Sequence, residues 1–395
     1  MNPTSFPRSS DAVIIGGGCM GASLAYHLTR RGIANVVIVE REAMLATGST
    51  GRNAGGVRHQ FSNEANIRLS IESIRTIERF EDEVGHPVDF HQDGYLFLLS
   101  SDESVETFRR NVTLQRRMGV AVDWLDARDA ATLAPGLDVH GVSAATYCAK
   151  DGIADPNGVT MGFAKAAQAG GATIVRDTEV TGVRVEGDRV RGVETSRGTI
   201  DTPIVVNAAG PWARQIGRMV GGVDVPVDPI RRHIFIAALD ASAGDGRARG
   251  VPGSHIMVID FATSFYFHRE GAGVLFGMGD PAERPSFDTT VQWDFLPQVI
   301  EAAVTRLPAL GGASISHAWA GLYEMTPDAN PLIGPTNVDG FYVLCGFSGH
   351  GFQHSPAAGR ILADIITGRD PQFDWSSFAL ARFSSEKAVG EKYVV

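Results

Sequence analysis

The sequence predicts an α/β protein in two parts, one built on a parallel βαβ sheet and the other on a mainly antiparallel β-sheet. Two observations predict this fold class. A strand–helix–strand pattern opens the chain over residues 11–40, whereas residues 222–322 contain mostly strand-like runs. With 395 residues, of which 44% are hydrophobic, the chain is long enough to form two or three domains.

A glycine turn joins the first strand to the first helix. Residues 11–15 form an apolar run, and the pattern G-x-G-x-x-G follows at Gly16, Gly18 and Gly21. In a Rossmann-type site the first glycine allows a tight turn, the second admits a pyrophosphate, and the third lets the helix pack on the strand. The helix N-terminus then offers free N–H groups and the positive end of its dipole to the phosphates.

A second apolar strand, residues 36–39, ends at Glu40. An acidic residue about 20 positions after the glycine turn can accept hydrogen bonds from an adenosine ribose. Because strand, turn, helix, second strand and acid all agree, the segment predicts a dinucleotide site. It does not by itself distinguish FAD from NAD.

Composition excludes several other classes. The net charge of −10 argues against binding to nucleic acid or to an anionic membrane surface. No apolar run is long enough to span a bilayer, and residues 1–10 lack the apolar stretch of a signal peptide. Cys19, Cys148 and Cys345 lie far apart without metal-ligand spacing, so we expect no metal and a reducing, cytoplasmic location.

The remaining pattern alternates between the two kinds of structure. Helices are predicted at 64–84, 102–118, 156–169 and 355–367, and strands at 94–99, 173–175, 180–185, 189–195, 204–207, 232–238, 256–259, 264–268 and 340–345. Because helical segments recur on both sides of the β-rich region, we expect the two parts to be interleaved along the chain.

Four segments carry a resemblance to a known superfamily. They are the turn at 11–21, the loop at 48–61, the N-A-A-G-P-W turn at 207–212 and the block G-F-S-G-H-G-F-Q at 346–353. In this order and spacing the chain resembles the D-amino-acid-oxidase-like FAD enzymes, and within them the sarcosine oxidase and dehydrogenase (glycine oxidase-like) group. The resemblance covers nearly the whole chain.

This resemblance implies a Rossmann-like FAD-binding domain with an interleaved, mainly antiparallel substrate domain. We assign residues 1–85, 150–220 and 325–380 to FAD binding. Residues 86–149 and 221–324 are assigned to the substrate domain, and 381–395 to a C-terminal tail.

The resemblance also implies the cofactor contacts. Ser49 and Thr50 are expected beside the pyrophosphate, and the helix after Gly349 is expected to point its N-terminus at the pyrimidine end of the flavin. Composition alone would make the 47–56 loop a flexible surface segment. The residues expected to contact FAD are Gly16, Gly18, Met20, Gly21, Glu40, Arg41, Ser49, Thr50, Arg52, Asn53, Ala54, Gly55, Gly56, Val180, Ala208, Ala209, Gly210, Trp212, Gly346, Gly349, His350, Gly351, Phe352 and Gln353.

Arg58 is the candidate for binding a substrate carboxylate. It begins the run Arg-His-Gln-Phe, which matches the context of the carboxylate-binding arginine in sarcosine oxidase-like enzymes, and a guanidinium can hold a carboxylate through two hydrogen bonds. The alternative is a surface arginine in a salt bridge. Arg52, in the same loop, is a weaker candidate.

Four other residues are candidates for the catalytic site. Tyr323 is implied to be an aromatic residue beside the substrate, with a half-buried core tyrosine as the alternative. Tyr266 shares one face of a strand with His268, and that face either lines the pocket or meets solvent. His350 is either an active-site or a capping residue. Gln353 replaces a lysine of monomeric sarcosine oxidases, so the substrate is expected to be larger, less anionic or held by other groups.

Two departures from the group affect the chemistry. Gly321 stands where some members carry a cysteine bonded to FAD, so we expect FAD to be noncovalent. Leu275 aligns with a lysine that helps oxygen reduction, which favours a dehydrogenase that passes electrons onward.

The expected function is FAD-dependent oxidation of the C–N bond of a small amino acid or secondary amine. Hydride transfer to flavin N5 would give an imine that hydrolyses, with oxygen or another acceptor taking the electrons. The alternatives are the flavin subunit of a multi-subunit amine dehydrogenase, which needs partner subunits, and a non-catalytic FAD-binding assembly factor. A homo-oligomer is also left open, and an NAD enzyme is least favoured.

Overall fold

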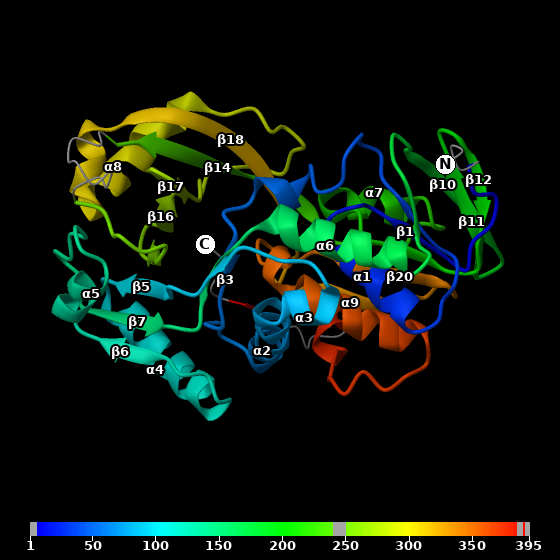
Figure 1. The fold of residues 1–395 in the computed structure, drawn as a ribbon, viewed down its shortest axis with the longest axis horizontal. Helices are drawn as coiled ribbons and strands as arrows, with labels where there is room; N and C mark the ends of the chain where they lie inside the picture. The colour runs from blue at the N-terminus through cyan, green and yellow to red at the C-terminus, as the bar shows by residue number, and fades with distance from the viewer. Residues whose placement is uncertain (1–5, 240–249, 385–389, 392–395) are drawn as a thin grey trace.

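The computed structural model describes residues 6–239, 250–384 and 390–391, and two large β-sheets dominate it. Figure 1 shows them in two halves of the molecule, with most of the long helices around the sheet on the right and a broad sheet on the left. The mixed α/β class expected from the sequence is confirmed. In the predicted C-terminal tail, residues 385–389 and 392–395 lie outside the described residues.

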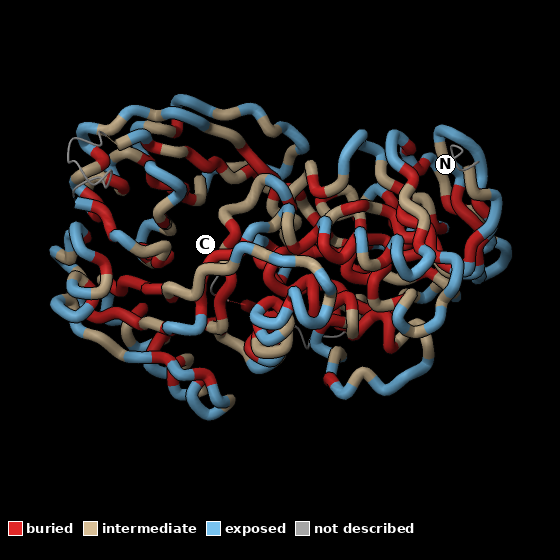
Figure 2. The backbone as a smooth tube through the Cα atoms, in the orientation of Figure 1, coloured by how far each residue is buried: buried red, intermediate tan, exposed pale blue. Residues whose placement is uncertain are grey.

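The first sheet has six strands, of which all but one edge strand run parallel. From edge to edge they are β19 (Leu332–Pro335), β20 (Phe341–Cys345), β13 (Val205–Asn207), β1 (Ala12–Ile15), β2 (Val36–Val39) and β9 (Thr173–Val175). Only β19 is antiparallel to its neighbour. Every residue of β1 and β2 is buried, which is why both are continuous apolar runs (Figure 2).

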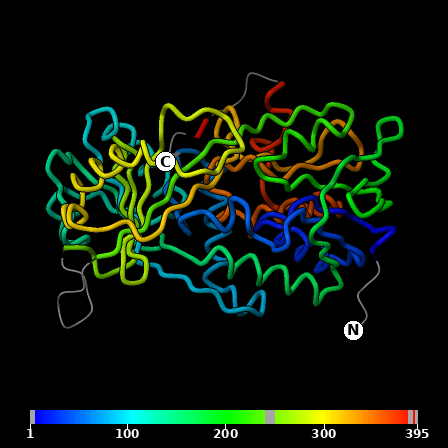
Figure 3. The backbone as a smooth tube through the Cα atoms, turned by 90° about the horizontal axis from the view of Figure 1, so that it is seen from above, coloured from blue at the N-terminus to red at the C-terminus, as the bar shows by residue number. Residues whose placement is uncertain are grey.

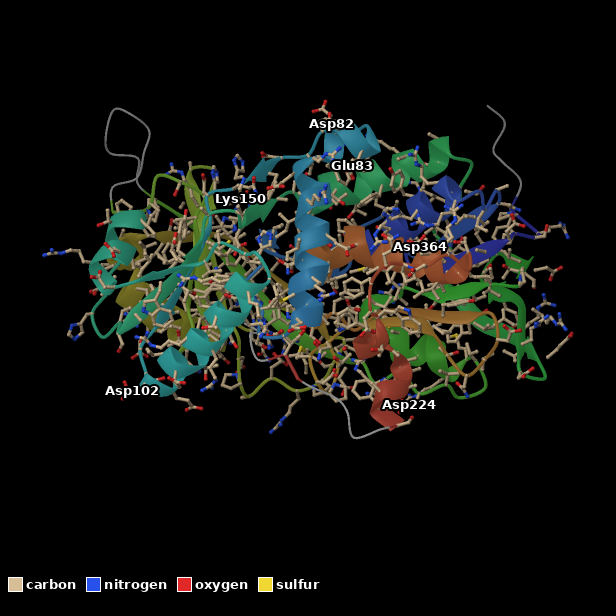
Figure 4. All side chains as sticks on the ribbon, turned by 90° about the horizontal axis from the view of Figure 1, so that it is seen from below. Asp82, Glu83, Asp102, Lys150, Asp224 and Asp364 are labelled. Atoms are coloured by element: carbon tan, nitrogen blue, oxygen red, sulfur yellow. The ribbon has the colours of Figure 1, made fainter. Side chains whose placement is uncertain are left out.

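Helices from both ends of the chain cover one face of this sheet. α1 (Cys19–Arg30) packs between α6 (Pro156–Ala169) and α9 (Gly351–Ile366), and α2 (Glu64–Glu78) packs on α9. Arg31, at the end of α1, forms an ion pair of 2.7 Å with Asp364 of α9. Figure 4 labels Asp364 on this helix. Figure 3 likewise shows the blue N-terminal and orange C-terminal segments in the same half of the molecule.

The opposite face of the first sheet is covered by a small antiparallel sheet and a short helix. These elements are β10 (Val180–Glu186), β11 (Arg189–Thr195), β12 (Gly198–Asp201) and α7 (Ala213–Arg218). Their valines and isoleucines form a core with β1, β2 and β20. Burial on both faces therefore fixes where the carboxyl ends of β1 and β2 lie.

The second sheet has eight strands. In order they are β18 (Ser314–Met325), β14 (Asp228–Ala238), β17 (Gly273–Met278), β16 (Phe265–Glu270), β15 (Met257–Asp260), β5 (Tyr95–Leu99), β7 (Ala144–Cys148) and β6 (Asp123–Leu125). All neighbours are antiparallel except β15 and β5. The outer helices are α4 (Asp102–Arg117), α5 (Ala127–Leu133) and α8 (Leu296–Arg306).

The chain alternates between the two sheets. The six-stranded sheet takes strands from 12–39, 173–207 and 332–345, and the eight-stranded sheet takes them from 95–148 and 228–325. A small sheet of β3 (Gly56–Val57), β8 (Gly152–Ala154) and β4 (Phe90–His91) lies where the chain crosses between them. The domain boundaries drawn from the sequence stay predictions.

Two helices differ from the sequence-based expectation. The predicted helix at 64–84 divides at Arg79 into α2 and α3 (Phe80–Val84). The last helix begins at Gly351, not near Ser355, and includes Pro356. Proline cannot donate to the carbonyl four residues earlier, and here the Ser355 hydroxyl donates to that carbonyl of Phe352 at 2.8 Å instead. Short 3-10 helices span Ser49–Arg52, Gly210–Trp212, Trp293–Phe295, Pro308–Gly312, Ser376–Phe378 and Leu380–Ser384.

Candidate active site

The glycine turn lies at the edge of a cavity of about 360 Å³, where the carboxyl ends of β1 and β2 meet the loop at 46–52 and the turn at 208–212. A Cβ atom at Gly16 would lie 2.4 Å from the carbonyl oxygen of Ala208, and one at Gly17 would lie 2.4 Å from a Leu45 methyl. Gly16, which meets fixed backbone, therefore admits no side chain. The N-terminus of α1 faces the Ser49–Arg52 segment, since the N–H of Cys19 donates to the Thr50 hydroxyl at 3.2 Å.

Two walls of this first cavity carry groups suited to an adenosine end. The Glu40 carboxylate accepts from the N–H groups of Gly17 at 2.7 Å and Glu42 at 2.9 Å, so it also holds the glycine turn. The Arg41 guanidinium lies 3.7 Å over the Trp212 ring, and Phe287 stacks on Trp212 with 5.5 Å between ring centroids. No sequence motif marked Phe287, which reaches this cavity from the segment that follows β17.

A second cavity of about 140 Å³ adjoins the first. The two share lining residues from α1, the 49–52 segment and β18, namely Cys19, Ser49, Thr50, Arg52, Leu322 and Glu324. The second cavity lies between the first turn of α9, the loop after β3 and the eight-stranded sheet. A long ligand can therefore extend from the glycine turn to the face of that sheet.

Three tyrosines line the second cavity, and each fills space that a glycine leaves. A Cβ atom at Gly56, Gly277 or Gly349 would lie 1.7, 2.4 or 2.4 Å from the nearest ring or hydroxyl atom of the facing tyrosine. The tyrosines in that order are Tyr95, Tyr266 and Tyr323. Burial raises the pKa of all three hydroxyls, so they are neutral hydrogen-bonding groups at ordinary pH.

Arg58 is buried, which excludes the surface salt bridge considered as its alternative. Its guanidinium lies 4.0 Å over the Phe61 ring and donates to the Gln60 carbonyl. Burial lowers the pKa of Arg58, but the charge of a guanidinium persists at any physiological pH.

A buried carboxylate positions the Arg58 loop. Asp151 accepts from the His59 N–H at 2.8 Å, contacts His59 Nδ1 at 2.7 Å and accepts from the Gln60 amide at 3.2 Å. With Cys148, His59 and Asp151 also form a group of potential metal ligands whose atoms lie within 4.8 Å of one another. Asp151 already accepts hydrogen bonds from the loop. The expectation that the protein holds no metal stays a prediction.

The first turn of α9 supplies two histidines, both uncharged. Burial and the neighbouring Arg58 hold the pKa of His350 well below its usual range and lower that of His354 to about 3. Both ring nitrogens of His350 are buried, and neither has a hydrogen-bond partner among the described residues. A ligand in the second cavity is the natural partner for these atoms.

Glu324 lines both cavities at the point where they meet. Its carboxylate accepts from the Gly346 N–H at 2.9 Å. Burial raises the pKa of this carboxyl to about 7, so it changes charge near neutral pH.

Nearly all of the expected contact residues line one of the two cavities. Arg58, Tyr266, Tyr323, His350 and Gln353 all face the second one. Three glycines of the expected set line neither cavity, namely Gly21, Gly55 and Gly346. A Cβ at Gly21 would lie 2.0 Å from the Gly16 carbonyl oxygen, so this glycine serves packing. His268 and Leu275 are buried in the second sheet and line neither cavity.

The sequence-based reading missed Tyr95, Arg232 and Glu324. Arg232 stands next to Arg231 on β14, and alternation along a strand places them on opposite faces, which is a usable signal. No sequence pattern marked Tyr95 or Glu324. Both lie at the end of a strand, and the placement of the two sheets decides which of these end residues meet the cavity.

These residues fit FAD. A turn that excludes side chains, a helix N-terminus without a side-chain cap from its N-cap residue and an acidic residue after β2 suit a dinucleotide. In the adjoining cavity the His350 nitrogens have no partner among the described residues. The profile of the family described as "DAO: FAD dependent oxidoreductase" matches residues 11–365. The chain belongs to this family. It is an FAD-dependent oxidoreductase, as the resemblance predicted.

Three relatives illustrate the similarity. Mitochondrial sarcosine dehydrogenase of Homo sapiens is 32% identical over 395 residues, which covers 95% of this chain but 42% of that protein. This chain therefore spans less than half the length of that relative. FAD-dependent oxidoreductase domain-containing protein 1 of Xenopus laevis is 30% identical, covering 98% and 85%. The crystal structure of L-proline dehydrogenase from P. horikoshii is 35% identical, with a TM-score of 0.87 over 96% of this chain and 99% of that one.

The described residues include no helix that combines the length and the apolar character needed to cross a bilayer. The cytoplasmic location stays a prediction, and one of the three relatives described above is named as mitochondrial.

Proposed function

We propose that the protein oxidises the C–N bond of a small amino acid or of a secondary or primary amine. When bound, FAD supplies the hydride acceptor, its N5 atom, and the product imine hydrolyses in water. The buried, charged Arg58 in the cavity that adjoins the dinucleotide cavity carries this proposal. It would hold the carboxylate of an amino acid in one orientation and so fix the reacting C–H bond.

The other cavity residues suit this reaction. Within the described part of the chain the lining offers neutral tyrosines, one neutral histidine (His350) and a single carboxyl group, Glu324, instead of a strong base. Burial next to arginines lowers the pKa of a bound ammonium group, which helps to release its proton. An amine that enters the cavity in its neutral form, or loses its proton there, needs no further acid or base before hydride leaves its carbon.

The names of two relatives support the substrate class. Sarcosine dehydrogenase and L-proline dehydrogenase are both named for amino acids with a secondary amine. We therefore propose sarcosine-like N-alkyl amino acids and proline-like imino acids as the first compounds to test.

The decisive experiment mixes the FAD-containing protein with these compounds without oxygen and follows the oxidised flavin absorbance. We expect at least one amino acid to bleach it, and we expect the methyl ester of the same compound, which lacks the carboxylate, to react far more slowly. Re-admitting air then separates an oxidase from a dehydrogenase. A flavin that no amino acid or amine bleaches would overturn the proposal and favour a non-catalytic FAD protein.

We also infer that FAD is held without a covalent bond. Gly321 lines the second cavity and offers no nucleophile, and burial raises the pKa of the Cys19 thiol to about 11, which keeps it protonated. Acid precipitation should therefore release the flavin into the supernatant. Flavin that stays with the precipitate would contradict this.

A further inference from the structure

Two adjacent arginines on β14 face in opposite directions. Arg231 is fully paired, with Glu283 at 3.0 Å and Asp288 at 2.6 Å. Arg232 instead lines the second cavity. Adjacent residues of a strand point to opposite faces. Arg231 is therefore paired on one side of β14, and Arg232 faces the cavity on the other.

Arg232 has no anionic partner among the described residues. Its guanidinium lies 4.9 Å from the centroid of the Tyr323 ring, and a Cβ at Gly279 would lie 3.7 Å from its Nε. Nη1 donates to the carbonyl of Arg231 at 3.0 Å. Its Nε is buried and has no hydrogen-bond partner, and no described acidic residue forms an ion pair with it.

Among the described residues that line the second cavity, positive groups outnumber carboxyl groups. Three arginines, Arg52, Arg58 and Arg232, line it against one carboxyl group, that of Glu324. Arg52 is engaged by the carbonyls of Ala320 and Thr47, at 2.9 and 3.3 Å. The positive charges of Arg232 and Arg58 both oppose the rise that burial causes in the pKa of the Tyr323 hydroxyl, so both guanidinium groups lie near it. Arg232 is partly buried, and its Nε is enclosed without a partner among the described residues, so an anionic group of a ligand is its expected partner.

We propose that Arg232 is a second anion-binding residue of this cavity and that it selects ligands with two carboxylates. One carboxylate binds at Arg58 and the other at Arg232. The inference rests on the proposed function in one respect, since it makes the substrate a dicarboxylic amino or imino acid whose second carboxylate is on the N-substituent or the side chain.

The test uses two ligands that contain sulfur in place of the amine nitrogen and that the protein is not expected to oxidise. Thiodiacetate carries two carboxylates and (methylthio)acetate carries one. Their binding to the FAD-containing protein is followed by the change in the oxidised flavin spectrum. We expect thiodiacetate to bind about tenfold more tightly or better, and Arg232→Gln to remove this preference.

Arg191→Gln is the matched control, because it removes one positive charge from an exposed position on β11 and should leave both affinities unchanged. Equal affinities for the two ligands in the unmodified protein would overturn the inference. So would equal weakening of both ligands by Arg232→Gln, because Arg232 would then hold the only carboxylate or the flavin.

Anaerobic bleaching by iminodiacetate and by sarcosine separates this inference from the proposed function. Bleaching by sarcosine that is as fast as by iminodiacetate, and is unaffected by Arg232→Gln, supports the proposed function and overturns the dicarboxylate preference. Failure of both amines to bleach the flavin, with thiodiacetate binding that still depends on Arg232, overturns the proposed function but supports the anion site.

Discussion

The side-chain oxygen of Gln353 accepts a hydrogen bond from the backbone N–H of Arg58 at 2.7 Å, although the two residues lie 295 positions apart. Gln353 belongs to the first turn of α9, and Arg58 follows β3. The bond therefore ties together two walls of the second cavity that come from opposite ends of the chain. The glutamine at this position thus holds the loop that carries the Arg58 cation.

Replacing Gln353 by alanine should loosen the Arg58 loop. The buried N–H of Arg58 would lose its acceptor, at a cost of about 1–3 kcal/mol in the free energy of unfolding. Denaturant unfolding of the FAD-containing protein measures this loss. Gln168→Ala, on the exposed side of α6, is the control and should change stability little. Equal stability of the two variants would show that the hydrogen bond contributes nothing.

Replacing Arg58 by alanine should impair turnover without releasing FAD. The anionic substrate would lose its charged partner, so we expect kcat/KM to fall about tenfold or more, equivalent to ~1.4 kcal/mol. Arg58→Lys keeps the charge but not the two-pronged geometry, and it should recover only part of the loss. Steady-state kinetics and the flavin-to-protein absorbance ratio test this. Unchanged kinetics in Arg58→Ala would remove Arg58 from the site.

A methyl group at Gly16 should abolish dinucleotide binding. Its Cβ would meet the Ala208 carbonyl oxygen at 2.4 Å, and φ of +113° already disfavours alanine. Gly32 also has a positive φ, of +88°, but a Cβ there meets nothing within 4 Å, so Gly32→Ala separates backbone strain from the steric clash. We expect Gly32→Ala to bind FAD normally and Gly16→Ala to be purified without it. Normal FAD content in Gly16→Ala would contradict the steric argument.

The sequence predicted those parts of the site that depend on consecutive residues. The turn at Gly16–Gly21 and the block ending at Gln353 have spacings set by their own backbone, so pattern and resemblance identified them. Tertiary packing decided the rest. Alternation places Arg231 and Arg232 on opposite faces, but only the position of Glu283 shows which arginine faces the cavity.

The start of α9 illustrates the same limit for secondary structure. A proline is usually found at the first turn of a helix, but Pro356 lies further inside α9, whose start was predicted near Ser355. The helix begins at Gly351, and the Ser355 hydroxyl donates to the Phe352 carbonyl that Pro356 leaves without a backbone donor. This difference matters for function, since it places His350 and Gln353 at the helix N-terminus beside the cavity.

Glu324 should make the stability of the protein fall as pH rises towards neutrality. Burial raises the pKa of this carboxyl to about 7 in the folded protein, from 4.5. Between these values the folded protein holds a proton that the unfolded chain releases, so rising pH lowers the free energy of unfolding, and above pH ~7 the effect is complete. At ~1.4 kcal/mol per pH unit, the total is on the order of 3 kcal/mol.

The variant Glu324→Gln removes the titrating proton but keeps an oxygen for the Gly346 N–H. Denaturant unfolding at saturating FAD, at several pH values between 5 and 8, should therefore show the unmodified protein losing stability relative to this variant as pH rises. Two thiols also lie near this carboxyl, Cys19 on α1 and Cys345 on β20, and burial raises the pKa of both, to about 11 for Cys19, which keeps them out of this range. Glu301→Gln, at an exposed position on α8, should show no such trend. Parallel pH profiles of the unmodified protein and Glu324→Gln would mean that Glu324 is ionised throughout, and that its carboxylate is stabilised by more than the two backbone N–H groups of the 346–347 segment.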